Sequence, residues 1–405
     1  MKKRFGILSV CILVLCGIAV GGVLCYVWAS PYLPGGAHYP AAAEPGDYDK
    51  LDEIRAYLDY YFVGDLDETQ LMDGAASGLI SGTGDRWSYY ISAEDLASYT
   101  EKMENAYVGV GITIRANEAE DGFTVTLVNA GGPAEAAGVQ PGDELIAVGG
   151  ANAWELGMDE TKNRVRGEAG TTVALTFCRD GEPYDVTLTR AKVETQIVSW
   201  NMLRDDTALI QIANFDTNSC RDAIAAIEAA CEAGARALVF DVRNNPGGLK
   251  HELVKLLDYL LPEGPLFRST SYDGKSEVDY SDKDCLSMPM AVLVNRDSYS
   301  AAEFFAVALQ EYDWATVIGT GTSGKGYYQN TFYLTDGSAI AISTGEYRTP
   351  QDKSLVGVGI EPDVYVELDS EDYVNQYYGL LDWQDDEQIL AALDALQMDE
   401  GSDQR

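Results

Sequence analysis

Basic residues and histidine are scarce in this sequence. Its 405 residues include 28 Lys and Arg against 65 Asp and Glu, so the formal net charge at pH 7 is −37. Phosphate backbones and anionic lipid surfaces repel such a protein, which excludes a nucleic-acid partner and electrostatic docking onto an anionic membrane surface. The only histidines are His38 and His251. Two histidines are too few for most histidine-based metal sites or proton relays. Nothing in the sequence requires a metal or an organic cofactor.

Cysteine is present without a recognisable pattern. Cys11, Cys16 and Cys25 lie in an apolar N-terminal segment, and the other four cysteines show no spacing typical of metal sites or disulfide frameworks. We expect them to be small buried hydrophobic residues. The composition, 46% hydrophobic and 23% charged, is typical of a folded globular protein, and the length suggests two or three domains.

A long uncharged segment lies close to the N-terminus. The 25 residues from Phe5 to Ala29 contain no Asp, Glu, Lys or Arg, and three basic residues precede them. A membrane-spanning helix needs about 20 residues, whereas the hydrophobic core of a cleavable signal peptide has about 7 to 15. The length favours a single-pass transmembrane anchor over 5–29, with a cleavable signal peptide as the alternative. The basic residues place 1–4 in the cytoplasm and the rest of the chain outside the cell membrane.

A linker and a helical segment follow. Four prolines and three glycines between residues 30 and 49 indicate a linker. After it, apolar residues recur at helical spacing, which predicts a small helical segment over 50–105. The residues that carry this pattern are Leu51, Ile54, Leu58 and Tyr61.

The rest of the chain divides into a β-rich part over 106–192 and an alternating part over 193–395, with an acidic tail over 396–405. In the alternating part, strand-like runs such as TALIQI, ALVFDV, MAVLVN and ATVIGT are separated by helical stretches such as 221–233 and 300–311. This alternation favours an α/β layer structure.

Glycine loops and a Pro-Gly-Asp turn characterise the β-rich part. The pattern consists of the loop Gly109, Val110, Gly111 and Ile112, the run 131–150 and the run 163–181. Together these resemble a PDZ domain, in which the loop presents backbone NH groups to the carboxylate of a peptide C-terminus and the next strand takes up the peptide as an added strand. The resemblance makes Arg166 a candidate cation near that carboxylate, with an exposed surface arginine as the alternative.

The segment GTGTSGKG at 319–326 superficially matches a phosphate-binding loop. Gly319, Gly324 and Lys325 fit the spacing, but Gly326 replaces the Ser or Thr that would hold magnesium. The following residues continue as a strand, where a phosphate loop opens a helix. Nucleotide binding is therefore rejected.

Three segments of the alternating part together form one sequence pattern. They are DVRNNPGG at 241–248, NRDSYSAAE at 295–303, and the glycine loop with its strand from Lys325 to Gln329. They resemble the carboxyl-terminal processing peptidases, or tail-specific proteases, which are serine peptidases with a serine-lysine dyad. The likeness extends from about residue 50 to 395 and includes the closing motif GVGIEPDVYV at 357–366. It implies crotonase/ClpP-like layering of the core and allows assembly as a homodimer.

Carried over by residue, the resemblance makes Ser300 the nucleophile, Lys325 the general base and Gln329 the group that holds the lysine. A lysine accepts the serine proton only when neutral, and lowering its pKa from about 10.4 to near 7 is within the range that burial produces. Gly324 and Gly326 would permit the close packing that buries the amine. Strand alternation would put residues 325, 327 and 329 on one side, with a bend at Gly326.

The position of Ser300 between a strand and a helix aims helical NH groups at developing negative charge. Gly247, Gly248 and the NH of Ala301 are the candidates for the oxyanion hole.

The sequence departs from the family pattern at Asp297, Tyr299 and Ala302. None of these changes removes a catalytic atom. Tyr299 would narrow the pocket, and Asp297 would keep Lys325 protonated if it were close. Two rivals are weighed against the dyad: Ser298 as the nucleophile, because geometry decides such an assignment, and His251 as the base.

The fold predicted is α/β: an N-terminal transmembrane helix, a small helical segment, an inserted PDZ domain and an α/β serine peptidase core. The function predicted is a membrane-anchored, extracytoplasmic serine endopeptidase that recognises the C-terminal tails of unfolded or flexible proteins through its PDZ domain. The alternative is a non-catalytic PDZ module that binds such tails.

Overall fold

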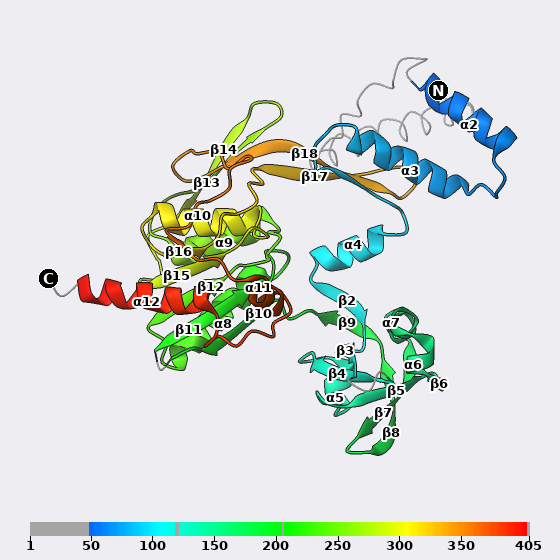
Figure 1. Cartoon of the computed structure of the whole chain (residues 1–405), viewed down its shortest axis with the longest axis horizontal. Helices are drawn as coiled ribbons and strands as arrows, with labels where there is room; N and C mark the ends of the chain where they lie inside the picture. The colour runs from blue at the N-terminus through cyan, green and yellow to red at the C-terminus, as the bar shows by residue number, and fades with distance from the viewer. Residues whose placement is uncertain (1–47, 118–120, 205, 403–405) are drawn as a thin grey trace, which may run out of the picture. The chain divides into compact units, whose positions relative to one another are not determined.

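The computed structural model describes residues 48–117, 121–204 and 206–402 (Figure 1). They belong to two compact units, one ending at Leu71 and the other beginning at Met72. The predicted cytoplasmic end, the anchor over 5–29 and nearly all of the linker lie outside the described residues. Within the described part of the chain, no helix is both long and apolar enough to cross a membrane.

The first unit contains α2 (Asp49–Tyr61) and the start of α3 (Glu68–Ser81). The helix predicted from the apolar spacing is present, but α2 buries none of its residues. Charged contacts occur instead: Arg55 Nε lies 2.9 Å from Asp59 Oδ1, and its guanidinium also pairs with Glu68.

A six-stranded sheet forms the centre of the α/β core in the second unit (Figure 1). In spatial order its strands are β10 (Val198–Met202), β11 (Thr207–Ile212), β12 (Ala237–Asp241), β15 (Met290–Val294), β16 (Thr316–Gly319) and β19 (Val364–Tyr365). All neighbours pair in parallel except β10, which is antiparallel to β11 at one edge. The α/β class predicted from the alternation of runs is confirmed.

Alternate residues of the central strands supply two cores. Ile210, Phe240 and Val292 face the side covered by α8 (Ser219–Glu232), α9 (Lys250–Leu260) and α10 (Ala301–Glu311). Their sequence neighbours, such as Val239 and Leu293, face the side on which α12 (Glu387–Ser402) packs. Every residue of β12 and β15 is buried, as parallel strands covered on both faces require. Each fully buried large apolar side chain contributes about 1.5 to 3 kcal/mol by leaving water.

A second sheet continues the core. Its path is β1 (Tyr89–Ile91), β18 (Ala339–Arg348), β13 (Gly264–Ser271) and β14 (Ser276–Ser281), and β17 (Tyr327–Tyr333) also pairs with β18. β1 interrupts the helical segment expected over 50–105, since its three residues pair antiparallel with β18 before α4 (Leu96–Met103) begins. A strand of three residues is too short to show a periodic pattern in the sequence.

The part predicted to be a PDZ domain has its own antiparallel sheet and core. The order is β3 (Ile112–Ala116), β4 (Phe123–Val128), β5 (Glu144–Val148), β7 (Thr172–Arg179) and β8 (Glu182–Thr189), with β6 (Ala151–Asn152) beside β5 and helices α5 (Pro133–Ala136), α6 (Ala153–Leu156) and α7 (Met158–Val165). Val110, Phe123, Leu145 and Phe177 are among its buried side chains. The predicted borders at 106 and 192 fall in a separate ribbon of β2 (Ala106–Gly109) and β9 (Ala191–Glu194).

A buried guanidinium joins the start of α12 to the loop after β12. Arg243 Nη2 lies 2.7 Å from Asp241 Oδ2, and Nη1 lies 2.8 Å from Asp386 Oδ2 and 2.9 Å from Gln388 Oε1. The core also extends past the predicted border at residue 395, because α12 runs to Ser402 and Leu396 is buried in it. The remaining helix, α11 (Ser370–Tyr377), precedes this contact in the chain.

One buried carboxylate stabilises the Pro-Gly-Asp turn of the PDZ domain. Asp143 accepts hydrogen bonds from Arg179 Nε (2.6 Å), from the Tyr184 hydroxyl (2.7 Å) and from the NH of Gln140 (2.7 Å). Led by the Arg179 contact, these bonds lower the pKa of Asp143 to about 2 against the effect of burial. A lowered carboxyl pKa stabilises the fold above the ordinary pKa near 4, and this stability is lost as the pH falls towards 2.

We expect Asp143→Asn to lower the free energy of unfolding of the PDZ domain by about 2 kcal/mol, because hydrogen bonds to a charged group contribute about 1.5 to 3 kcal/mol. Native-state hydrogen exchange of the β7 amides measures the effect. Glu160→Gln is the control, since Glu160 lies on the PDZ surface and its pair with Arg164 is exposed. The Asp143 assignment is contradicted if the two variants lose protection equally.

Candidate active site

Ser300 occupies a strained turn between β15 and α10. It is the residue before the first turn of α10, its φ is 59° and its ψ is −124°. A positive φ is rare for a residue other than glycine, and such a conformation costs about 1 to 3 kcal/mol. Ser300 therefore lies where a strand gives way to a helix, as the sequence predicted, in a conformation that its surroundings must enforce.

The carboxylate of Glu303 joins the serine turn to the lysine loop. Glu303 is completely buried in the first turn of α10. Its Oε2 accepts hydrogen bonds from the NH groups of Ser300 and Lys325, each at 2.9 Å. Its Oε1 accepts one from the NH of Gly324 at 2.8 Å and one from the Thr322 hydroxyl. One side chain thus fixes both backbone segments that carry the candidate dyad.

Close backbone packing encloses the lysine loop. Gly324 has a φ of 76°, and a Cβ there would come within 2.9 Å of the nitrogen atoms of Val358 and Gly359. A Cβ on Gly326 would lie 2.8 Å from the nitrogen of Val356. The packing expected at both glycines is present, and the closing motif of the chain provides the opposing surface.

The ammonium group of Lys325 lies against two aromatic rings. Its Nζ is 4.9 Å from the ring centre of Trp87 and 5.6 Å from that of Tyr299. Burial lowers the pKa of Lys325 to about 8, although the charges of Asp85 and Glu303 raise it. At pH 7, roughly one lysine in ten is then neutral and able to accept a proton.

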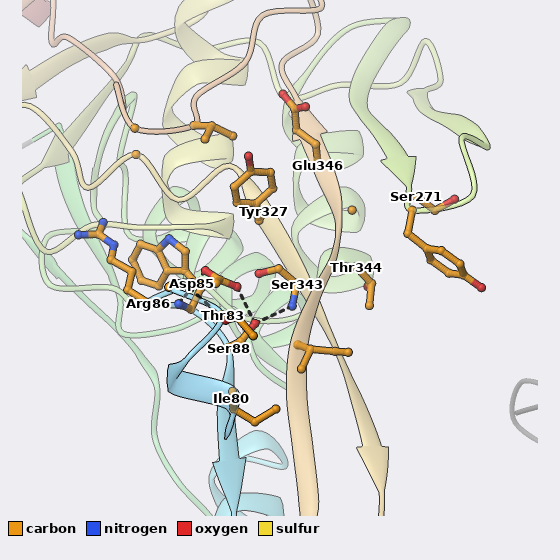
Figure 2. A pocket seen from close by; sticks show the side chains of 18 of the residues that line it. Ile80, Thr83, Asp85, Arg86, Ser88, Ser271, Tyr327, Ser343, Thr344 and Glu346 are labelled. Atoms are coloured by element: carbon orange, nitrogen blue, oxygen red, sulfur yellow. Dashed lines mark hydrogen bonds between the residues drawn. The ribbon is translucent and has the colours of Figure 1, made fainter. Parts of the chain in front are cut away.

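The loop before β1 brings Trp87 and Asp85 to the lysine. Figure 2 shows how Ser88 fixes this loop: its hydroxyl donates to Asp85 Oδ2 (2.5 Å) and accepts from the NH of Ser343 (3.0 Å). The NH of Trp87 donates to Asp85 Oδ1 (3.0 Å). Burial raises the pKa of Asp85, but hydrogen bonds from Ser343 and Ser88 outweigh it and hold that pKa below its ordinary value.

Two pockets contain residues of the lysine loop and of β17. The pocket in Figure 2, of about 1140 Å³, is lined by the loop before β1 and by β18, and Tyr327 belongs to it. Ser300, Lys325 and Gln329 line a different pocket of about 760 Å³. The prediction that residues 325, 327 and 329 share one side is therefore wrong. β17 begins only at Tyr327, and its register shifts before Gln329.

Gln329 has other partners than the lysine. Its Nε2 donates to the carbonyl of Tyr327 (3.2 Å) and to the Ser343 hydroxyl (3.1 Å). The structure brings Gln329 into the pocket of Ser300 and Lys325, and its role in holding the lysine stays a prediction.

The loop after β12 lies against the serine. A Cβ on Gly247 would come within 2.7 Å of Ser300 Cβ and of the nitrogen of Ala301, so only glycine fits there. The NH of Gly247, however, donates to Asn245 Oδ1 at 2.8 Å. The NH of Gly247 is thus engaged in this structure, and Gly247 permits the close approach to Ser300. The roles of Gly247, Gly248 and Ala301 in an oxyanion hole stay predictions, with the NH groups of Gly248 and Ala301 the stronger candidates.

Comparison with known proteins identifies two domains. The pattern of peptidase family S41 matches residues 206–366, and that of a PDZ domain matches residues 124–179. A probable CtpA-like serine protease of Staphylococcus aureus (strain COL) is 29% identical over 369 residues, which cover 90% of this chain and 73% of that protein. The chain therefore contains a peptidase S41 domain. It is a serine-type endopeptidase that carries a PDZ domain.

One solved structure agrees with this fold. A putative S41 protease from Bacteroides fragilis NCTC 9343 has a TM-score of 0.50 at 16% identity, over 85% of this chain and 94% of that one. The photosystem II D1 C-terminal processing protease has a TM-score of 0.45 at 26% identity, over 79% and 87% of the two chains.

The rival residues of the peptidase are engaged elsewhere. Ser298 is completely buried, and its hydroxyl donates to the carbonyl of Val242 at 2.7 Å. His251 is exposed at the start of α9, where its Nε2 lies 3.3 Å from Glu252 Oε1. Neither residue lines the pocket of Ser300.

The three residues that depart from the family pattern have different surroundings in the structure. Tyr299 lines the pocket and contacts Trp87, with ring centres 5.5 Å apart, and its narrowing of the pocket stays a prediction. Asp297 accepts a hydrogen bond from the Tyr373 hydroxyl, and Asp85 and Glu303 are the carboxylates whose charges bear on Lys325. Ala302 is fully buried in α10.

The PDZ residues lie together between β2 and β3. Gly109 ends β2, Val110 is buried, Gly111 has a φ of 83° and Ile112 begins β3. Arg166 follows α7, where its Nη1 lies 3.3 Å from Glu101 Oε2. Their contact with a peptide carboxylate stays a prediction.

Glu303, Asp85 and Trp87 have no role in the site predicted from the sequence. Glu303 had a recognisable signal, because a serine followed three residues later by glutamate is the pattern of a helix capping box. Asp85 and Trp87 had none, since their position beside Lys325 arises only when β1 pairs with β18.

We expect Glu303→Gln to lower kcat/KM by about 10²-fold, because a displaced catalytic pair loses much of its rate advantage. Removing the Glu303 charge should also move the pH midpoint of the activity below 8, since that charge raises the pKa of Lys325. Steady-state kinetics from pH 6 to 10 measure both effects.

Glu311→Gln is the matched control for this variant. Glu311 lies on the same helix, and its carboxylate accepts hydrogen bonds from the Thr349 hydroxyl (2.9 Å) and the NH of Gln351 (2.8 Å). It should leave kcat/KM within a few-fold and the midpoint unchanged. A bridging role for Glu303 is refuted by an unmoved midpoint together with near-normal kcat/KM.

Proposed function

We propose that this chain is a membrane-anchored, extracytoplasmic endopeptidase that cleaves flexible polypeptides with Ser300 and Lys325 after its PDZ domain has bound their C-terminal tails. One observation carries the proposal. Ser300, on a strained turn at the start of a helix, lines the same pocket as Lys325, whose pKa burial lowers to about 8.

The chemistry proposed follows from these groups. Neutral Lys325 takes the proton of the Ser300 hydroxyl while the serine Oγ attacks the carbonyl carbon of the substrate. The NH groups of Gly248 and Ala301 and the N-terminus of α10 stabilise the negative oxygen. The lysine then returns the proton to the leaving amine, and the acyl-enzyme remains. Water, deprotonated by neutral Lys325, hydrolyses the acyl-enzyme, and the serine regains its proton.

The PDZ domain supports recognition of C-termini. Peptides add to such domains as an extra strand while backbone NH groups hold the terminal carboxylate. The loop from Gly109 to Ile112 has the required position before β3, and the positive φ of Gly111 supports a turn of the backbone there.

The apolar segment from Phe5 to Ala29 supports the anchored, extracytoplasmic location. It is long enough to span a membrane, and the basic residues before it favour a cytoplasmic N-terminus.

We expect the purified full-length chain in mild detergent to cleave an unfolded reporter polypeptide. Ser300→Ala and Lys325→Arg should each lower kcat at least about 10³-fold, because arginine preserves the charge but does not act as a base at accessible pH. The exposed Lys283→Ala is the control and should cleave normally. Mass spectrometry of the products gives the rates. Equal cleavage by wild type and both site variants would refute the dyad. A wild type that binds tails and never cleaves would favour the non-catalytic module.

The same assay has a predicted pH dependence. Because Lys325 acts when neutral and its pKa is about 8, kcat/KM should rise about tenfold per pH unit below pH 8 and level off above it. A profile that is flat from pH 6 to 9 excludes Lys325 as the base.

A further inference from the structure

An acidic side chain without a partner lines the pocket of the candidate dyad. Asp216 is only 4% exposed and belongs to the same pocket as Ser300 and Lys325. Its Oδ1 is enclosed and has no hydrogen-bond partner among the described residues. Burying a carboxylate without a partner is costly, so the folded chain by itself gives no reason for an acid at this position.

The backbone fixes Asp216 beside the serine. The NH of Phe215 donates to the carbonyl of Gly247 (2.7 Å), and the NH of Leu249 donates to the carbonyl of Phe215 (2.8 Å). A Cβ on Gly248 would come within 2.3 Å of the carbonyl carbon of Phe215. Because Gly247 also packs on Ser300, the backbone at Asp216 and the backbone at the nucleophile both lie against residues 247–249.

A structural role in the helix that follows does not explain the carboxylate. Asp216 precedes α8, and its backbone carbonyl accepts the NH of Ser219 at 3.1 Å. The residue at the helix N-cap is Asn218, and Oδ1 of Asp216 donates nothing and accepts nothing. The charge of Lys102 bears on Asp216, but this lysine forms no hydrogen bond with that oxygen.

The other pocket walls suit the stem of a cationic side chain. Tyr89 and Tyr99 line the pocket, with ring centres 6.3 Å apart. Aromatic faces attract ammonium and guanidinium groups, and the long apolar stems of lysine and arginine pack on such rings. Burial raises the pKa of Asp216 to about 7, an effect that an incoming cation would offset.

We infer that Asp216 determines specificity by receiving a lysine or arginine side chain of the substrate next to the scissile bond. The inference rests on the proposed endopeptidase function and adds a substrate class to it. The net charge of −37 acts in the same direction, because it favours the approach of basic polypeptides.

The test uses the full-length chain and two sets of unfolded peptides that differ only in arginine or its uncharged analogue citrulline, all with the same C-terminal tail. Wild type should cleave the arginine peptides about 10- to 100-fold better in kcat/KM, as a charge-assisted hydrogen bond predicts. Asp216→Asn should remove most of this ratio and should keep its rate on citrulline peptides. Its thermal midpoint should not fall, because the variant buries no charge.

Glu277→Gln is the matched control, since Glu277 lines the same pocket but pairs with Lys250 (3.6 Å) and is exposed. It should keep the arginine preference. If wild type shows no preference, or if Asp216→Asn retains it, the inference fails while the endopeptidase function stands.

A binding experiment that does not depend on cleavage tests the role of Asp216 separately from the endopeptidase function. In Ser300→Ala, the arginine peptide should bind at least several-fold more tightly than the citrulline peptide by fluorescence anisotropy, and adding Asp216→Asn should abolish the difference. Equal binding of both peptides refutes the inference even if no variant cleaves.

Discussion

The carboxylate of Glu303 is the constraint on which the candidate site depends. Four donors from two separate segments converge on it, among them the NH groups of Ser300 and Lys325. A buried carboxylate is stable only when hydrogen bonds satisfy its oxygens. With all four bonds present it holds the two segments together, whereas the loss of these bonds would destabilise both segments. The positive φ of Ser300 is maintained by the same bonds, because a strained backbone persists only where its surroundings over-determine it.

Lys325 experiences two opposed influences. Packing of the closing motif on Gly324 and Gly326, with Trp87 and Tyr299 over the amine, removes water and favours the neutral form. The charges of Asp85 and Glu303 favour the ammonium form. Burial is the stronger influence, and the resulting pKa of about 8 leaves the amine mostly neutral in mildly alkaline solution and partly neutral at pH 7.

The negative charge of the chain acts over two distances, on the approach of polypeptides and within the pocket. The net charge of −37 influences which polypeptides approach, and salt screens this effect beyond about 10 Å. Asp216 acts within the pocket, where screening is weak and one charge selects one side chain. Both favour basic substrates, whereas binding of a terminal carboxylate has to rely on backbone NH groups of the PDZ loop.

The sequence by itself determined the order of elements, because periodicity and glycine turns are local properties. The run TALIQI at 207–212 predicts a strand, and Ser300 could be placed at a helix start from its neighbours alone. Only the tertiary structure decided which groups surround them. β1, the loop carrying Asp85, and the use of the Gly247 NH by Asn245 arise from contacts between distant segments or from exact backbone geometry. Burial and local charge set the chemistry of a side chain, and both depend on neighbours that no local pattern records.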